Sequence, residues 1–274
     1  MKIKFVKTFQ VAAFAALFLL PDILQGWGFW AHKTITRKAI SAMPEPVSGF
    51  FQTNADSLAE KSIDPDLWRR HDQKESNRHF IDIDEYGAFP YNELPRDYDA
   101  AVAKFGEERV LKAGIAPWRI MEMLDSLSHA MKKLDQKHII RYATALAHYV
   151  EDIHMPLHTV TNYDGQFSGN KGIHSRYERW MLEAHKEQAI ERIKPGDPQV
   201  IPDVLNTVFE WVLDSNIWAD NLLLADTRSK LSGKSYDSRE DFDAAYYDAL
   251  HKNTRPFTGM QMSRAATAVA SCWL

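Results

Sequence analysis

The most constraining feature of the sequence is a helical segment that is apolar apart from a dense run of histidines and carboxylates. Residues 148–158 hold three His and two acidic side chains within 11 positions of an otherwise apolar helical pattern. Burying so many polar groups costs free energy unless hydrogen bonds or metal ions compensate. The chain must therefore fold so that other polar groups, or metals, meet this segment.

Most of the chain shows a helical pattern, with apolar residues recurring at intervals of three and four. Runs of alternating β-branched residues are nearly absent, and the polar stretches 80–96 and 159–173 are typical of ordered loops. These patterns predict an all-α, single-domain multi-helix bundle, a fold in which metal sites are built from side chains on facing helices. We expect helices over residues 34–43, 97–112, 118–134, 137–155, 174–192, 200–225, 239–252 and 258–272.

Residues 1–26 have the pattern of a secretory signal peptide. Lys2, Lys4 and Lys7 precede the apolar stretch 11–20, which is too short to span a bilayer because that requires about 20 residues. We expect this segment to be removed on export, leaving residues 27–274 as one domain that begins at Trp27. The sequence thus predicts a secreted or periplasmic protein.

Composition limits both the crosslinks and the partners of the chain. Its 45% hydrophobic content excludes a largely disordered protein, and the single cysteine, Cys272, excludes an intramolecular disulfide. The formal net charge is -4, and the three Lys and one Asp of residues 1–26 would leave -6 on the rest. Such a charge provides no global attraction to nucleic acid or to an anionic bilayer, so a polyanionic substrate must be held locally.

Two pairs of side chains have the spacing of helical metal ligands. His148 and Asp152 are four residues apart, as are His174 and Glu178, so each pair lies on one face of a helix and can reach one cation. Taken singly, each pair is equally consistent with hydrogen-bonded core histidines or a solvated helix face. His154 faces away from His148 and could lie at the surface or behind the ligands.

Two further elements carry candidate ligands. One contains Asp64 and Asp66, then His71-Asp72 and His79; the other is the segment from Trp27 to His32. The His71-Asp72 dipeptide leaves an HD-phosphohydrolase open as an alternative, and the acidic residues could instead be helix caps or turn residues.

In chain order, these elements resemble a known superfamily, which comprises the fungal single-strand-specific nucleases and the bacterial zinc-dependent phospholipases C. The shared pattern is a mature Trp followed by a His, an Asp before a His-Phe, His-x3-Asp-x5-His, and His-x3-Asp/Glu. The resemblance implies a helical domain with three Zn²⁺ ions in a cleft.

The resemblance also implies a ligand for each ion. It assigns Asp66, His79, His148 and Asp152 to the first zinc, His158, His174 and Glu178 to the second, and the amine and carbonyl of Trp27 with His32 and Asp152 to the third. Asp66 is preferred to Asp64 because the family's Asp is commonly followed, three residues on, by Arg or Lys, as Asp66 is by Arg69.

The chemistry implied by this resemblance is hydrolysis of a phosphodiester by a metal-activated water that attacks phosphorus. Asp66 and Asp152 are the expected catalytic carboxylates, and Arg78, Arg176 and Trp30 are candidate substrate contacts. Because no disulfide is possible, the metals are also expected to stabilise the fold.

The sequence favours a phospholipase C-like enzyme, with a single-strand-specific nuclease as the alternative. Glu178 and the short loop before it resemble the phospholipases, whereas the spacing from Trp27 to His32 resembles the nucleases. Trp30 stands where choline-specific phospholipases have an acidic residue. The expected substrate is a phospholipid headgroup or single-stranded nucleic acid, and we expect a monomer without a protein partner. A non-catalytic, metal-stabilised binding protein is a further alternative.

Overall fold

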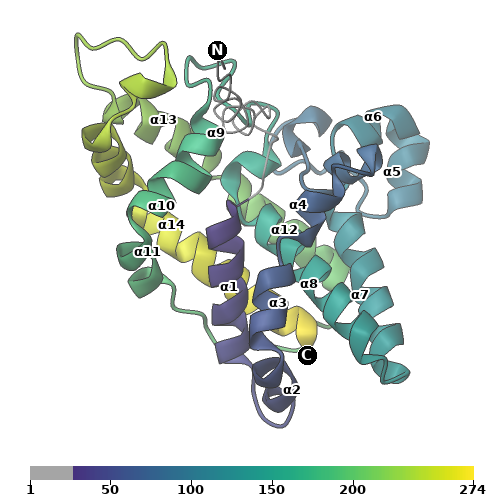
Figure 1. Ribbon diagram of the computed structural model, residues 1–274. Coiled ribbons are helices and arrows are strands. Elements are labelled where there is room, and N and C mark those ends of the chain that lie inside the picture. Colours follow the sequence, from purple (N-terminus) through teal and green to yellow (C-terminus); the bar gives the residue numbers. More distant parts are fainter. Residues whose placement is uncertain (1–26) are drawn as a thin grey trace, which may run out of the picture.

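The structure, a computed structural model, describes residues 27–274, which fold into helices joined by loops and short turns (Figure 1). The expected signal peptide, residues 1–26, lies outside the described residues. No strand occurs within 27–274, which confirms the all-α prediction. The α-helices are α1 (Phe29–Ala42), α2 (Ser48–Thr53), α3 (Ala55–Lys61), α4 (Asp64–Trp68), α5 (Tyr98–Phe105), α6 (Glu107–Lys112), α7 (Ala116–Lys132), α8 (Gln136–Ile153), α9 (Ile173–Ser175), α10 (Leu182–Ala184), α11 (Lys186–Arg192), α12 (Val204–Asn216), α13 (Ala219–Ser229) and α14 (Ala244–Trp273). Short 3₁₀ turns cover Gln73–Arg78, Ile83–Tyr86, Pro156–Thr159 and Arg239–Asp241, and a π-helix covers Arg176–Met181.

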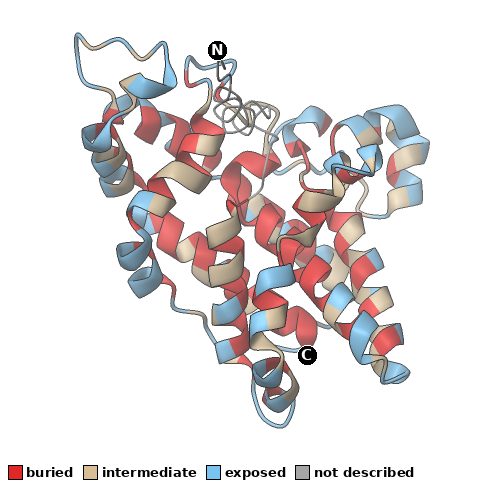
Figure 2. Ribbon diagram, in the orientation of Figure 1, coloured by how far each residue is buried: buried red, intermediate tan, exposed pale blue. Residues whose placement is uncertain are grey.

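Helix α8 forms the centre of the core. Every residue from Ala143 to Ile153 is buried, as expected for a helix that is surrounded on all sides. It packs against α1, α3, α4, α7, α12 and α14. Buried residues follow the central helices in Figure 2, whereas α5 and α6 at the edge are largely exposed. One continuous hydrophobic cluster extends from Trp27 to Trp273, as a single domain requires.

Aspartates begin several of the helices that frame the core. The side chain of Asp135 accepts a hydrogen bond from a backbone N–H in the first turn of α8 at 3.2 Å, and Asp243 does the same for α14 at 3.0 Å. Each cap satisfies one of the N–H groups that a helix start leaves without an intrahelical partner. None of the helices within 27–274 combines the length and hydropathy that a bilayer crossing needs.

Three predicted helices are divided in the structure, one of which, expected over 174–192, is interrupted at His185 between α10 and α11. The expected helix 97–112 breaks into α5 and α6 at Gly106, whose φ of 84° is a conformation that glycine adopts readily. The expected helix 200–225 becomes α12 and α13, with a short turn at residues 217–218.

Near the C-terminus, the sequence predicts two helices where the structure has one. The helices predicted at 239–252 and 258–272 are joined in one continuous helix, α14, which begins only at Ala244 and contains Pro256. Pro256 is exposed, so the backbone carbonyl that loses its hydrogen bond can be hydrated and the helix continues. The prediction of a break was therefore wrong.

An extended connector, residues 193–203, runs along α14 between α11 and α12. Three of its backbone N–H groups donate to the hydroxyls of Ser263, Thr267 and Ser271 at 2.8, 2.9 and 3.0 Å. These residues follow one another at intervals of four, so their hydroxyls form a row on one face of α14. The connector is held along this row although no strand pairs with it.

Candidate metal centre

Two elements bring the first group of candidate ligands together. His148 and Asp152 lie one turn apart on α8, and Nε2 of His148 is 3.2 Å from Oδ2 of Asp152. His79 follows the 3₁₀ turn Gln73–Arg78, and its Nδ1 lies 2.9 Å from that oxygen and 3.0 Å from Nε2 of His148. All three side chains are buried, and their atoms lie close enough to hold one ion.

Asp66 on helix α4 lies beside the first group, and together with His148 and His32 it also forms a buried group close enough to hold one ion. Its Oδ1 lies 3.8 Å from Nδ1 of His79 and 3.8 Å from Nε2 of His148. When N and O atoms bind zinc tetrahedrally at about 2.0–2.1 Å, any two of these ligand atoms lie about 3.3 Å apart. The separations of 2.9–3.8 Å among the atoms of this group are close to that value. The side chain of Asp64 is 34% exposed, and its Oδ2 lies 4.0 Å from Nζ of Lys61. The structure thus brings Asp66, rather than Asp64, to the group.

The second group joins the loop after α8 to the turn that begins at Ile173. Nε2 of His158 is 3.2 Å from Nε2 of His174, which is 2.9 Å from Oε2 of Glu178. Glu178 lies in the π-helix Arg176–Met181, and π-helical turns are frequent at functional sites. These three side chains are also buried and grouped closely enough for one ion.

Backbone carbonyls fix the orientation of three imidazoles. In His148, His158 and His174 the Nδ1 atom donates to a backbone carbonyl oxygen at 2.7, 2.7 and 3.1 Å, respectively. This places the proton on Nδ1 and directs the Nε2 lone pair toward the groups, the usual arrangement of metal-binding histidines. His79 is turned the other way, with Nε2 3.4 Å from Oε1 of Glu75 and Nδ1 toward the first group.

A third cluster forms where α1 meets α8. Nδ1 of His32 lies 2.5 Å from Oε2 of Glu151, and its Nε2 is 3.5 Å from Oδ1 of Asp152. The buried indole of Trp27 donates to the backbone carbonyl of Glu151 at 2.8 Å. Asp152 therefore has one oxygen toward His32 and the other toward the first group. Whether Trp27 carries a free amine depends on residue 26, which lies outside the described residues.

The clusters concentrate buried charge. Burial alone would raise the pKa of Asp152, but the surrounding imidazoles hold it well below its ordinary value. Burial raises the pKa of Glu178 to about 7, against the opposing effect of His174. Burial would lower the pKa of His32, yet its contacts with Asp152 and Glu151 raise it to about 10. The imidazoles thus favour the ionised form of Asp152 on balance but only partly offset the burial of Glu178, and a divalent cation would favour the ionised form of both.

Several buried atoms in these clusters have no hydrogen-bond partner among the described residues. They are Nε2 of His32, both oxygens of Asp66 and Oδ1 of Asp152. Oε2 of Glu178 also lacks a hydrogen bond of good geometry, although it lies 2.9 Å from Nε2 of His174. Buried polar atoms are nearly always satisfied, so each such atom needs an explanation. Imidazole nitrogens and carboxylate oxygens are the ligands that zinc takes besides thiolates. The residues present therefore fit bound zinc.

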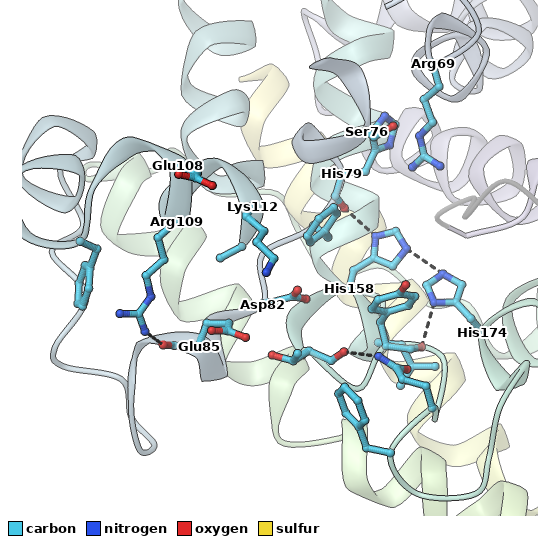
Figure 3. Close-up of a pocket in the computed structure, with 18 of the residues that line it drawn as sticks. Arg69, Ser76, His79, Asp82, Glu85, Glu108, Arg109, Lys112, His158 and His174 are labelled. Atoms are coloured by element: carbon cyan, nitrogen blue, oxygen red, sulfur yellow. Dashed lines mark hydrogen bonds between the residues drawn. The ribbon is translucent and has the colours of Figure 1, made fainter. Parts of the chain in front are cut away.

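A cavity of about 1000 Å³ opens beside the second group (Figure 3). His158 and His174 line one end of it, and Arg109 on α6 lines the other. Asp82 and Lys112 lie between these ends in Figure 3. The cavity is therefore large enough for a ligand that extends well beyond the candidate metal ligands.

Asp82 is a further unusual carboxyl group in this cavity. It is 9% exposed, and its Oδ1 has no hydrogen-bond partner among the described residues. Burial, together with the negative charges of Asp84 and Glu85, raises its pKa to about 7. Near neutral pH it can therefore donate or accept a hydrogen bond.

Arg176 does not lie at the cavity, so the prediction that it contacts the substrate is not supported. We expected it near a substrate phosphate, but its guanidinium is absent from the lining of the cavity and donates to Oδ1 of Asp226 at 2.9 Å and to the Tyr246 hydroxyl at 2.9 Å. Asp226 is a buried anion 50 residues away, which nothing near Arg176 in the sequence indicates.

The other two expected substrate contacts also lie outside the cavity lining. Arg78 donates to Glu75 at 2.6 Å and to Asp72 at 3.2 Å, and so supports the residue that contacts His79. Trp30 is half-buried on α1, with the ammonium of a neighbouring lysine 5.9 Å from its ring.

Two histidines of the sequence motifs lie apart from the groups. His154 is buried, donates from Nδ1 to the carbonyl of Val150 at 2.7 Å, and lines a second cavity of about 470 Å³. His71 is exposed and belongs to none of the groups found within 27–274. The HD-phosphohydrolase alternative, which requires His71 as a ligand, is therefore not supported.

Three residues near the candidate ligands were not predicted from the sequence to be functional. Glu151 holds His32, Glu75 contacts His79, and Arg69 lines the cavity with its NH2 3.5 Å from Oδ1 of Asp66. The spacing of Arg69 from Asp66 was a usable signal for a phosphate contact. Glu151 and Glu75 gave none, because their partners come from distant parts of the chain.

A helical core that holds groups of imidazoles and carboxylates beside a large cavity has the parts that a metal-dependent hydrolase requires. Comparison with protein-family models identifies the family. The family model "S1/P1 Nuclease" matches residues 28–186, and the chain belongs to this family within the phospholipase C/nuclease superfamily. The protein is accordingly a zinc-dependent phosphodiesterase. A separate comparison with curated proteins found no match. The phospholipase C interpretation, which the sequence placed first, is not confirmed, and the match favours the nuclease.

Proposed function

We propose that the protein is a single-strand-specific nuclease that hydrolyses phosphodiester bonds in DNA and RNA. The observation that carries this proposal is the nuclease-family match over the segment that supplies every candidate ligand from His32 to Glu178. We propose three zinc ions, one for each cluster of side chains, because the sequence resembles a superfamily with three. Bound zinc would supply a Lewis acid and lower the pKa of a water molecule that attacks phosphorus.

The lining of the cavity supports a single strand as substrate. Phe105 and Phe167 line it together with three cationic and three acidic side chains, which are Arg69, Arg109, Lys112, Asp82, Glu85 and Glu108. Aromatic side chains stack on unpaired bases, and cationic side chains hold the phosphates of a strand. A duplex keeps its bases stacked inside and cannot offer them to the cavity without unpairing.

The residues of the first group have distinct proposed roles. Asp66 has two buried oxygens without hydrogen-bond partners, so one can face a cation while the other orients a water molecule or accepts its proton. Arg69, 3.5 Å from Asp66, is placed to hold a phosphate oxygen of the substrate. Asp152 is placed between the first and third clusters. No covalent nucleophile from the protein is needed.

Export is part of this proposal. We propose that residues 1–26 direct secretion or periplasmic delivery and that cleavage before Trp27 frees its amine to join His32 as a ligand. Mass spectrometry of the amino terminus of the exported protein tests this step. A different terminus would remove the amine from the proposed third ligand set and leave the first two groups unchanged.

The proposed function is tested by assaying the zinc-loaded protein side by side on single-stranded DNA, RNA, duplex DNA and phospholipid micelles. We expect cleavage of both single strands and much slower cleavage of the duplex. Asp66→Asn should abolish this activity with helicity retained. Asp64→Asn is the matched control because Asp64 lies two residues away and outside the group.

Other outcomes would assign a different function. Hydrolysis of micellar phospholipid without cleavage of nucleic acid would identify a phospholipase C. Tightly bound zinc without activity on any phosphodiester would identify a metal-stabilised binding protein.

A further inference from the structure

The chain beyond residue 186, outside the family match, reaches back to the second group. Asp226 on α13 is fully buried, and its Oδ1 accepts hydrogen bonds from Arg176 at 2.9 Å and from the hydroxyl of Tyr246 on α14. Its Oδ2 accepts from Nδ2 of Asn170 at 2.6 Å and lies 3.0 Å from Nζ of Lys230. One carboxylate therefore ties α13, which Figure 1 shows near α9, and α14 to the turn of the second group.

The guanidinium of Arg176 is held on every side. Its Nε donates to the Tyr246 hydroxyl at 2.9 Å, NH1 to the carbonyl of Lys171 at 2.8 Å, and NH2 also to the carbonyl of Asn170 at 3.0 Å. The ring of Phe242 lies 4.0 Å from its central carbon. Arg176 is only 6% exposed, so it cannot leave this position without unpairing a buried charge.

This arginine stands midway between two candidate metal ligands. It follows His174 by two residues and precedes Glu178 by two, within the turn that widens into the π-helix. Gly172, with a φ of 85°, starts that turn, and a Cβ there would lie 2.7 Å from NH1 of Arg176. Backbone and guanidinium are thus in close contact at the start of the turn.

We propose that Arg176, Asp226 and Tyr246 form a clamp that positions His174 and Glu178 for metal binding. The clamp rests on the proposed function, because it assumes that these two side chains bind zinc. Buried ion pairs add little net stability compared with apolar residues of similar size, so their main effect here is to fix one conformation of the turn. Residues that hold metal ligands in place affect metal affinity strongly.

The clamp gives the C-terminal part of the chain a role in the site. Asp226 and Tyr246 lie outside the segment that the family model matches, yet they hold the turn that carries the second group. They act as positioning residues, since neither belongs to a metal-binding group or lines the cavity.

The test compares zinc binding by the wild-type protein with that of two variants. In the double variant Arg176→Met/Asp226→Leu, apolar groups replace both buried charges, so neither is left buried without the other. Lys230, the other cation beside Asp226, has a side chain that is 22% exposed and can be hydrated. Tyr246→Phe removes only the hydroxyl. Zinc content is measured by mass spectrometry after dialysis against graded chelator, and Co²⁺ absorption spectra report the geometry of the sites.

We expect the double variant to bind one of the three ions about 10- to 100-fold more weakly, with the other two unchanged and helicity retained. Tyr246→Phe should show a loss toward the lower end of that range. Asp248→Asn is the control, because this carboxylate on α14 pairs with His185 at 2.9 Å and does not contact the clamp. It should bind all ions as the wild type does.

Two results would overturn the clamp separately from the proposed function. A folded double variant with wild-type zinc affinity and Co²⁺ spectrum would show that the pair has only a structural role. Unchanged affinity in Tyr246→Phe would lead to the same conclusion if the double variant does not fold. A wild-type protein that binds no zinc would instead overturn the proposed function.

Discussion

Removal of bound metal should cost the protein much of its folding stability. His32, Asp66 and Asp152 each have a buried atom without a hydrogen-bond partner among the described residues. An unsatisfied buried polar group costs about 1–3 kcal/mol, so these three together cost about 3–9 kcal/mol when no cation binds them. Domains have a net stability of about 5–15 kcal/mol, and the only cysteine, Cys272, allows no disulfide to compensate.

The assay is thermal unfolding, followed by far-UV circular dichroism, of the zinc-loaded protein and of the same protein after chelation. In a chain of this length 1 kcal/mol corresponds to about 2–4 °C, so a loss of about 3 kcal/mol lowers Tm by at least about 6 °C. The control Asp64→Asn should keep the full shift, whereas Asp66→Asn should reduce it. Metal analysis that shows complete removal of zinc with Tm unchanged within about 2 °C would refute the reasoning.

Three further outcomes are expected. Arg69→Met should lower kcat/KM on single-stranded DNA about 100-fold with zinc content unchanged, because it removes a cation that can hold the substrate phosphate. Steady-state rates within a few-fold of wild type would exclude that role for Arg69. Gly114→Ala should destabilise the protein by about 2 kcal/mol or more in urea unfolding, since φ is 90° and a Cβ would lie 2.3 Å from the carbonyl oxygen of Phe80, whereas Gly106→Ala, with φ 84° and open space, should lose only about 1 kcal/mol. Burial and neighbouring positive charges lower the pKa of His251 from 6.5 to about 4. As the pH drops, the unfolded chain therefore binds a proton before the folded one does, and the free energy of unfolding falls between pH values of about 6.5 and about 4. His251→Gln should remove that part of the acid sensitivity, and urea unfolding curves with the same pH dependence in both proteins would contradict this.

The sequence predicts the fold class well because helical periodicity is a local property. The helix predicted over 137–155 corresponds to α8 (Gln136–Ile153), and the one over 118–134 to α7 (Ala116–Lys132). Boundaries that depend on the surroundings were less accurate. Pro256 continues a helix because it is exposed, a fact that the residues beside it do not show.

Candidate ligands were recognisable because their spacing along α8 and after it is local. The contacts that orient them are not local, and these escaped prediction. Glu151 meets His32 across 119 positions, and Asp226 meets Arg176 across 50. A single sequence shows the residue types but not which distant partner fixes each side chain, which is why Arg176 was expected at the substrate.

The hydroxyl row on α14 has a consequence for limited proteolysis. The connector 193–203 is largely exposed and is held by Ser263, Thr267 and Ser271 at its backbone rather than by a buried side-chain face. A protease that cuts there would meet little resistance. The two fragments would stay together, because α14 packs against α1 and α8 on the far side of the cut, and the nicked protein would migrate as one species until it is denatured.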